Sequence, residues 1–221
     1  PIFHYIDGGS DDERTLNRNT EAFDDCDLVP KILANVGKPD LSTTVFGRKI
    51  SMPIFLSPAA MQRLYHPEGD KASARAAEKF NTFYSMSTMS NNSIEQIANL
   101  SSGPKLFQLY IHKDQSITDD LIDRCKRANF DGLCLTVDTI VAGNRERDHR
   151  TGFTTPPKLT LKSLFSFAIK PKWVFDYLTN EKFELSNVKN KTDKGTNITK
   201  SVIEYINEQY DPGMNWSDAE Y

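Results

Sequence analysis

The sequence predicts an α/β protein whose strands and helices alternate along the chain. Apolar runs of strand length occur at residues 53–57, 82–86, 105–110 and 132–137, and stretches with helical character lie between them. Parallel strands joined by single helices produce this alternation, and nearly continuous apolar runs are typical of strands buried on both faces. We therefore expect four strand-helix units that share one parallel sheet.

Two elements are predicted before this repeat begins. Residues 11–23 are mostly polar, with Leu16 and Phe23 seven positions apart, a spacing that indicates a helix. Residues 43–45 and 49–50 flank a short turn that contains glycine, which predicts a β-hairpin. Such a hairpin could close one end of a barrel.

Three helices are predicted within the repeat, over residues 69–80, 93–100 and 116–129. The first is rich in Ala, Lys, Arg and Glu, which favour helix formation. Ser93 is followed three residues later by Gln96, the spacing of a capping box at a helix N-terminus. These signals separate the expected strands at regular intervals.

Two architectures are compatible with such a repeat, a doubly wound sheet and part of a TIM (β/α)8 barrel. A doubly wound nucleotide-binding sheet would carry a glycine-rich phosphate loop after its first strand, but residues 58–61 read PAAM. Barrel enzymes keep their chemistry at the carboxyl ends of the strands, where this chain has Ser87, Gln108, Tyr110, Thr136 and Asp138. We expect the barrel, which needs about 250 residues, with this chain supplying roughly the first four strand-helix units.

The repeat is interrupted after the fourth strand. Residues 155–178 carry many aromatic and aliphatic side chains among lysines, and residues 181–200 are dominated by Asn, Lys and Thr. We expect an insertion at about residues 152–200, with its polar part forming a mobile surface loop. Residues 1–221 would then be the N-terminal part of a single domain, and Pro1 in place of Met leads us to expect that both ends are cut.

Composition and charge exclude several classes of function. The chain has 27 basic and 30 acidic residues, so it has no general attraction to polyanions, and we expect no nucleic acid partner. Its three cysteines and four histidines lack the paired spacing of metal sites or disulfide frameworks. No apolar run of membrane-spanning length and no signal sequence is recognisable. These observations favour a cytoplasmic protein without a metal.

Polar residues at the strand ends form a candidate ligand site. Gln108 and Tyr110 alternate along one strand and should point together into the barrel mouth, where polar groups are costly unless they meet a ligand or each other. Thr136 and Asp138 repeat this alternation; the carboxylate could orient a histidine or cap a helix. Arg145, in the next loop, could hold a carboxylate bidentately, although its arginine-rich surroundings also fit ordinary solvated charge. The residues by themselves predict a barrel mouth with an anion site.

Short motifs in the same order along the chain resemble a known family. They are residues 5–9 (YIDGG), 51–54 (SMPI), 57–61 (SPAAM), 66–69 (HPEG), 107–110 (FQLY), 135–139 (LTVDT) and the loop that holds Arg145. Over almost its whole length, the chain resembles the FMN-dependent 2-hydroxy-acid oxidases and dehydrogenases. The resemblance implies FMN as cofactor and a small 2-hydroxy acid as substrate.

The resemblance also implies roles for individual residues. The isoalloxazine ring would be held by Ala59, Ala60, Ser87, Gln108 and Thr136. The substrate would be bound by Tyr5, Tyr110 and Arg145, with Arg145 gripping its carboxylate. Tyr110 and Asp138 would be catalytic, Asp138 by stabilising the imidazolium form of the family's histidine base. We expect that histidine, a second arginine, a lysine and a phosphate-binding loop to follow Tyr221.

The insertion is similar to that of respiratory L-lactate dehydrogenases, and its residues 171–173 and residues 211–218 carry this likeness. We therefore expect oxidation of L-lactate to pyruvate, an electron acceptor of the respiratory chain, and a homotetramer. Residues 158–178 are predicted to contact the inner face of the membrane peripherally; a lid or a subunit contact is the alternative. Met89 stands where glycolate-type oxidases have a bulky aromatic residue. A glycolate-type oxidase that produces hydrogen peroxide and a non-catalytic half-barrel remain open.

Overall fold

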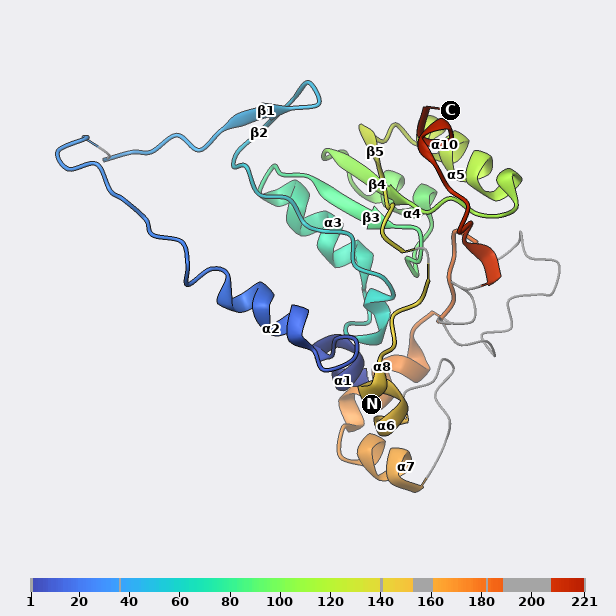
Figure 1. Cartoon of the computed structure of the whole chain (residues 1–221). Coiled ribbons are helices and arrows are strands. Elements are labelled where there is room, and N and C mark those ends of the chain that lie inside the picture. Colours follow the sequence, from blue (N-terminus) through green and yellow to red (C-terminus); the bar gives the residue numbers. More distant parts are fainter. Residues whose placement is uncertain are drawn as a thin grey trace.

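A computed structural model of the chain describes residues 2–35, 37–139, 141–152, 161–181, 183–188 and 208–220. Its centre is a three-stranded parallel sheet in the order β3-β4-β5, made by Tyr84–Ser87, Lys105–Leu109 and Gly132–Leu135. Helix α4 (Ile94–Leu100) connects β3 to β4, and α5 (Gln115–Arg127) connects β4 to β5 (Figure 1). The predicted alternation of parallel strands and helices is confirmed for these elements.

The first predicted strand, residues 53–57, is reduced to a single bridge between Leu56 and Tyr84. Leu56 N donates to Phe83 O at 3.0 Å, and Ser85 N donates to Leu56 O at 3.0 Å. The segment therefore runs parallel to β3 without forming a ladder. Proline has no N–H group to donate, and Pro53 lies within the predicted strand. The prediction of a regular strand here was wrong.

The strands differ in burial according to their place in the sheet. Every residue of β3 and β4 is buried, as predicted for strands covered on both faces, but β5 is exposed at Leu133 and Cys134. Helix α3 (Asp70–Lys79) precedes β3 and packs against it. The described sheet thus has a well-covered centre and a more open edge at β5.

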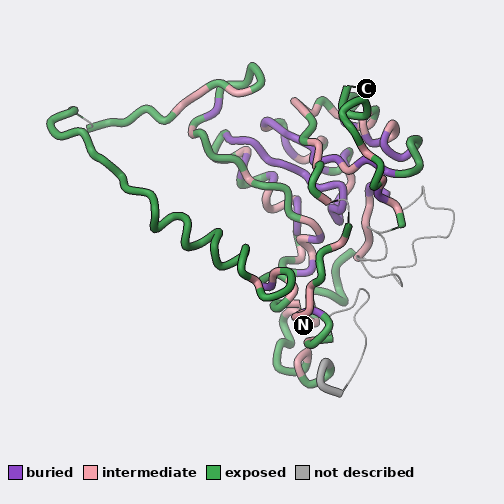
Figure 2. Tube along the Cα trace, in the orientation of Figure 1, coloured by how far each residue is buried: buried purple, intermediate pink, exposed green. Residues whose placement is uncertain are grey.

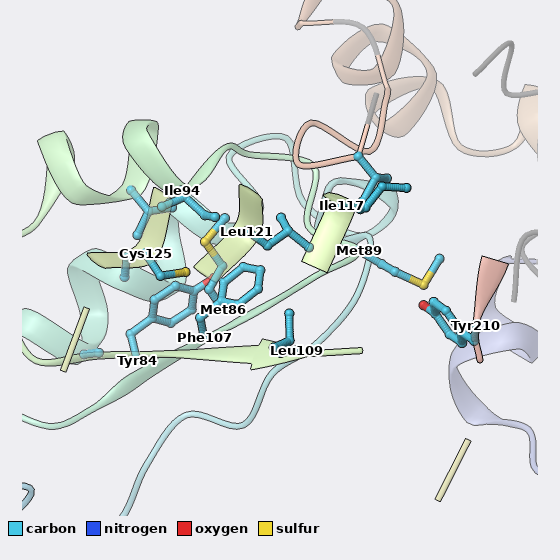
Figure 3. Close-up of a cluster of buried hydrophobic side chains, with 14 residues drawn as sticks. Tyr84, Met86, Met89, Ile94, Phe107, Leu109, Ile117, Leu121, Cys125 and Tyr210 are labelled. Carbon is cyan, nitrogen blue, oxygen red and sulfur yellow. The ribbon is translucent and has the colours of Figure 1, made fainter. Parts of the chain in front are cut away.

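The core lies between the sheet and helices α3, α4 and α5, and Figure 2 shows many of the buried residues, in purple, along these elements. Tyr84, Met86 and Phe107 project from the strands toward Ile94 and Leu121 of the helices (Figure 3). Burial of such side chains stabilises the fold by about 1.5–3 kcal/mol each. The Ser93 capping box is present as predicted, because the Ser93 side chain accepts from Gln96 N while the Gln96 side chain accepts from Ser93 N. Packing in this core and the Ser93 cap hold the helices in place against the strands, and this fixes the positions of the strand ends.

The N-terminal part forms an arm that extends away from the sheet (Figure 1). It contains α1 (Ile2–Asp7), α2 (Arg14–Glu21) and the antiparallel hairpin β1 (Thr43–Val45) and β2 (Arg48–Ile50). The hairpin agrees with the prediction, but α2 is shorter than the predicted residues 11–23. Asp11 and Glu13 have left-handed backbone angles, with φ of 47° and 58°, which are incompatible with a continuous helix.

After β5 the chain forms α6 (Glu146–Thr151), α7 (Leu161–Ala168) and α8 (Pro171–Thr179), and α10 (Trp216–Glu220) follows later. Among the described residues, no helix combines the length and apolarity needed to cross a bilayer. The same residues contain no group of three His, Cys, Asp or Glu side chains that could hold a metal ion.

The predicted insertion is described only in part, because residues 153–160, 182 and 189–200 lie outside the described residues. Residues 183–188, which fall in the predicted mobile loop, pack on the strand-helix core. Ser186 N donates to Ser90 O at 3.3 Å, Ile94 N donates to Asn187 Oδ1 at 3.0 Å, and Val188 is fully buried. The prediction of a mobile loop was wrong for this segment. The side chain of Asn187 accepts a hydrogen bond from the backbone N–H of Ile94, the first residue of α4, and this holds the segment in place.

Candidate functional site

The carboxyl ends of the three parallel strands bring Ser87, Gln108 and Thr136 into one hydrogen-bonded row. Ser87 Oγ donates to Gln108 Oε1 at 3.2 Å, and Gln108 Nε2 donates to Thr136 Oγ1 at 2.7 Å. Thr88 N also donates to Gln108 Oε1, at 3.3 Å. Ser87 and Gln108 are buried, so these bonds satisfy groups that water does not reach. Three of the predicted flavin-binding residues are therefore side by side.

Ala59 and Ala60 lie in the loop that precedes η1, a 3₁₀ turn at Gln62–Leu64. Met61 N donates to Met89 O at 3.1 Å, which ties this loop to the segment just after β3. Ala59 is exposed and Ala60 is half-buried, and neither side chain extends beyond Cβ. A flat ring can approach such a backbone closely. The loop and the polar row together therefore fit the isoalloxazine ring of FMN.

A buried carboxylate, that of Asp70, is linked by hydrogen bonds to the loop that holds Ala59 and Ala60. Asp70 is fully buried at the start of α3 and accepts hydrogen bonds from Tyr84 Oη at 2.6 Å and Gln62 Nε2 at 3.2 Å. Burial raises the pKa of Asp70, and the hydrogen bond from Tyr84 opposes this rise. Gln62 Nε2 also donates to Ala59 O at 3.4 Å. Asp70 is thus connected, through Gln62, to the backbone predicted to face the flavin.

A second group brings together Tyr5, Arg145 and Asp148. The Arg145 guanidinium lies over the Tyr5 ring, 4.9 Å from its centroid, and Nη2 donates to the Tyr5 carbonyl oxygen. Arg145 Nε also pairs with Asp148 Oδ2 at 2.7 Å. Burial raises the pKa of Tyr5, with the Arg145 charge opposing this and the Asp148 charge adding to it. Tyr5 therefore remains a protonated hydroxyl donor at neutral pH.

Tyr110 follows directly after β4. Its ring stacks on Tyr210, with centroids 4.3 Å apart and an interplanar angle of 20°. Burial raises its pKa, a hydrogen bond with Thr139 opposes the rise, and Asp138 adds to it. The charge of Tyr110 also adds to the rise in the pKa of Tyr5. Of the three predicted substrate-binding residues, Tyr5 and Arg145 are therefore in direct contact, and Tyr110 acts on Tyr5 electrostatically.

Asp138 lies differently from the position its spacing predicts. Strand β5 ends at Leu135, so the predicted alternation does not continue through residue 137 to Asp138. Thr136 faces Gln108, but Asp138 is exposed and accepts a hydrogen bond from Thr139 Oγ1 at 3.3 Å. The prediction that both side chains share a strand face was wrong, although the charge of Asp138 still adds to the rise in the pKa of Tyr110.

Four contributors were missed in the sequence, namely Asp70, Asp148, Tyr210 and Tyr65, whose hydroxyl donates to Ala60 O at 2.8 Å. Asp148 has a local signal, since an acid three residues after Arg145 can pair with it on a helix. Tyr210 has none, because it reaches Tyr110 through a segment that is distant in the sequence. This segment is held by Lys113 N donating to Gln209 O at 2.8 Å and by Asp211 N donating to Ile111 O at 3.2 Å.

The whole chain, residues 1–221, matches the family described as FMN-dependent dehydrogenase. The chain belongs to this family. Glycolate oxidase 1 of Oryza sativa subsp. indica is 37% identical over 220 residues, which cover 100% of this chain and 54% of that protein. L-lactate dehydrogenase of Vibrio parahaemolyticus is 35% identical over 221 residues, covering 100% of this chain and 58% of that protein. The chain spans about half the length of the curated relatives it matches.

The solved structures that are similar to this chain support the same family assignment. The monotopic membrane protein (S)-mandelate dehydrogenase matches with a TM-score of 0.89 and 29% identity, over 98% of this chain and 57% of that one. A lactate oxidase of Pediococcus acidilactici matches with a TM-score of 0.68 and 39% identity, over 76% of this chain and 46% of that one. The structure of a mandelate oxidase variant with a C4a-OH-FMN adduct matches with a TM-score of 0.66. The predicted fold, the N-terminal part of an FMN-dependent TIM barrel, and the prediction of FMN are confirmed.

The stability of the protein should depend on pH because of His112, which packs against Tyr210. The ring of His112 packs edge-on to Tyr210, with centroids 5.5 Å apart, and burial lowers the pKa of His112 to about 4 from 6.5. Between these pH values the unfolded chain binds more protons than the folded chain, so the free energy of unfolding should decrease as the pH falls from 6.5 toward 4. The full difference corresponds to roughly 3 kcal/mol.

This prediction is checked by urea unfolding of the full-length protein across that pH range. His112→Gln removes the titrating group and should flatten the decrease. His149→Gln changes an exposed histidine and should retain the wild-type decrease. An identical pH dependence in the wild-type and His112→Gln proteins would contradict the assignment.

Proposed function

We propose that the complete protein oxidises L-lactate to pyruvate with FMN and passes the electrons to an acceptor of the respiratory chain. The proposal is carried by the hydrogen-bonded row of Ser87, Gln108 and Thr136, which would meet the flavin, together with the contact between Arg145 and Tyr5, which would receive the substrate carboxylate. Membership in the family supports the general class, an FMN-dependent oxidation of a 2-hydroxy acid.

The charges and protonation states of the substrate group suit a 2-hydroxy acid. A guanidinium can bind a carboxylate through two parallel hydrogen bonds, so Arg145 would hold the acid end of the substrate. Burial raises the pKa of both Tyr5 and Tyr110, so both phenols stay protonated and can donate to the substrate. Three anchoring groups would fix the orientation of a small molecule before reaction.

The flavin supplies the two-electron chemistry when bound, and the protein supplies orientation and charge. The backbone of Ala59 and Ala60 would lie against one face of its ring, and the row centred on Gln108 would meet its polar edge. Asp138 is proposed as a positioning residue that hydrogen-bonds the histidine base of the complete enzyme. The exposed carboxylate of Asp138, which accepts a hydrogen bond from Thr139, is available for such a partner.

A glycolate-type oxidase is the second candidate, because relatives named glycolate oxidase are 37% identical to this chain and a relative named L-lactate dehydrogenase is 35% identical. Met89 and the insertion favour lactate. Met89 is buried in the same core cluster as Tyr210, and Tyr110 packs against this cluster. The flexible thioether of Met89 gives the substrate pocket a different shape from the one that a rigid aromatic ring would give.

We also propose a cytoplasmic homotetramer with peripheral membrane contact through residues 158–178. The described part of this segment exposes apolar side chains on α7 and α8, among them Leu164, Phe165 and Leu178. Lys170 precedes α8 and Lys172 lies in its first turn, and both could meet anionic lipid headgroups. Similarity to the monotopic (S)-mandelate dehydrogenase supports this proposal. Residues 158–160 lie outside the described residues.

The function is tested with the FMN-loaded full-length protein under anaerobic conditions. L-Lactate should reduce the flavin, as seen by loss of its visible absorbance, faster than glycolate does, and pyruvate should form with an artificial acceptor. Arg145→Lys loses bidentate geometry and should raise the KM for L-lactate about tenfold or more, with FMN content unchanged.

Three outcomes of this assay would contradict parts of the proposal. Stoichiometric hydrogen peroxide in air would favour the oxidase, and preferential reduction by glycolate would remove lactate as the substrate. Equal losses of substrate and FMN binding in Arg145→Lys would show that Arg145 does not act through the carboxylate.

The membrane contact predicts that charge on the exposed apolar surface prevents lipid binding. The double variant Phe165→Asp/Leu178→Asp should lose sedimentation with vesicles of phosphatidylglycerol and phosphatidylcholine, because inserting carboxylates among lipids is costly. Phe23→Asp, an exposed aromatic residue of the N-terminal arm, is the control and should sediment like the wild type. Equal sedimentation of all three proteins would favour a lid or subunit contact.

A further inference from the structure

A short segment that follows the predicted insertion, residues 208–211, packs on residues 110–113, which come directly after β4. Two backbone hydrogen bonds join the segments, from Lys113 N to Gln209 O at 2.8 Å and from Asp211 N to Ile111 O at 3.2 Å. They flank an antiparallel bridge between His112 and Tyr210. The chain beyond the end of β4 is therefore held by a segment that is distant in the sequence.

The bridge places the ring of Tyr210 against two aromatic side chains. It stacks on Tyr110, with centroids 4.3 Å apart at 20°, and meets His112 edge-on, with centroids 5.5 Å apart at 85°. Residues two apart in an extended chain point to the same side, which explains why both rings reach Tyr210. Tyr210 is only 3% exposed and belongs to the main core cluster, which also contains Leu109 and Met89 (Figure 3). Its ring is thus fixed by the core.

The stack restricts the side chain of Tyr110. Tyr110 is half-buried and packs against the core cluster, so Tyr210 is one of the few surfaces that can hold its ring. A ring that lies nearly parallel to a fixed neighbour keeps its plane, and its hydroxyl then keeps its position. A group that acts on a substrate must be held within about 0.5 Å of the productive geometry by the side chains packed against it.

We propose that Tyr210 is a positioning residue for the reaction, holding the Tyr110 ring so that its hydroxyl meets the substrate. Tyr210 acts through Tyr110 and does not itself bind the substrate. This inference rests on the proposed function, which assigns Tyr110 to the 2-hydroxy acid. The segment after the insertion would then help to determine the geometry of the substrate site.

The proposal is tested by stopped-flow reduction of the FMN-loaded full-length protein with L-lactate under anaerobic conditions. Tyr210→Leu removes the stacked ring and should lower the limiting rate of flavin reduction about tenfold or more, because a small misplacement of a reacting group slows the reaction strongly. The dissociation constant for L-lactate should change much less, since Arg145 still holds the carboxylate. Tyr210→Phe keeps the ring and should keep the wild-type rate.

A matched control separates positioning from a general loss of packing. Phe130→Leu removes the edge contact between Phe130 and Phe107, whose centroids are 6.2 Å apart at 83°, in the same core. This contact does not include Tyr110, so the variant should retain the wild-type limiting rate. An equal fall in rate for Phe130→Leu and Tyr210→Leu would overturn the proposal, as would a wild-type rate for Tyr210→Leu.

A double-mutant cycle shows whether Tyr210 acts through Tyr110. Once Tyr110→Phe has removed the hydroxyl, adding Tyr210→Leu should slow flavin reduction little further. Losses that multiply would contradict the proposed role. If Tyr210→Leu does not fold, Tyr210→Met takes its place in each comparison, because a flexible thioether fills the space of the ring without stacking on Tyr110.

A fluorine signal tests the positioning without a substrate. With 3-fluorotyrosine at position 110, the ¹⁹F resonance should shift in Tyr210→Leu and remain near the wild-type position in Tyr210→Phe, and an unchanged resonance in Tyr210→Leu would overturn the proposal. If L-lactate fails to reduce the wild-type flavin while this signal still depends on the ring of Tyr210, the proposed function fails and the positioning of Tyr110 stands.

Discussion

A buried primary amide, that of Gln108, constrains the rest of the site. An amide in a dry environment needs partners for both its oxygen and its nitrogen, and leaving one without a partner costs about 1–3 kcal/mol. Gln108 finds them in Ser87 and Thr88 on one side and Thr136 on the other. These partners follow from the observed register, in which β3 pairs with β4 and β4 pairs with β5. The way the three strands are aligned therefore determines, through the Gln108 amide, the arrangement of the polar groups that would face the edge of the flavin.

The substrate group depends on a different kind of interaction. Charge holds α1 and the start of α2 against α6, since Arg147 pairs with Asp7 of α1 at 2.9 Å and with Glu13, the residue before α2, while Arg145 donates to the carbonyl oxygen of Tyr5. Partly exposed ion pairs contribute little individually, but several that share one short helix can fix its position. The proposed flavin row is thus built into the sheet, whereas Tyr5 is carried by the short helix α1, which packs against α6. Tyr110 follows directly after β4 and is held by its stacking on Tyr210.

Much of the fold was predictable because its signals are local. Continuous apolar runs identified β3 and β4, and the Ser93 spacing identified the start of α4. Residues at strand ends identified the polar row, since parallel strands bring their carboxyl ends to one edge. Contacts between distant segments could not be predicted, such as Tyr210 on Tyr110 or Asn187 on the N-terminus of α4. Local apolarity also cannot reveal that the segment around Leu56 pairs at a single residue.

The central claim is that the satisfied amide of Gln108 holds the flavin edge in place, and FMN affinity of the Gln108→Leu protein tests it most directly. Full-length wild-type and variant proteins would be stripped of FMN and titrated with it. Loss of the amide should weaken FMN binding by about tenfold or more, because Ser87 and Thr136 would lose their buried partner. An unchanged dissociation constant, in a variant with wild-type unfolding behaviour, would contradict this account of the site.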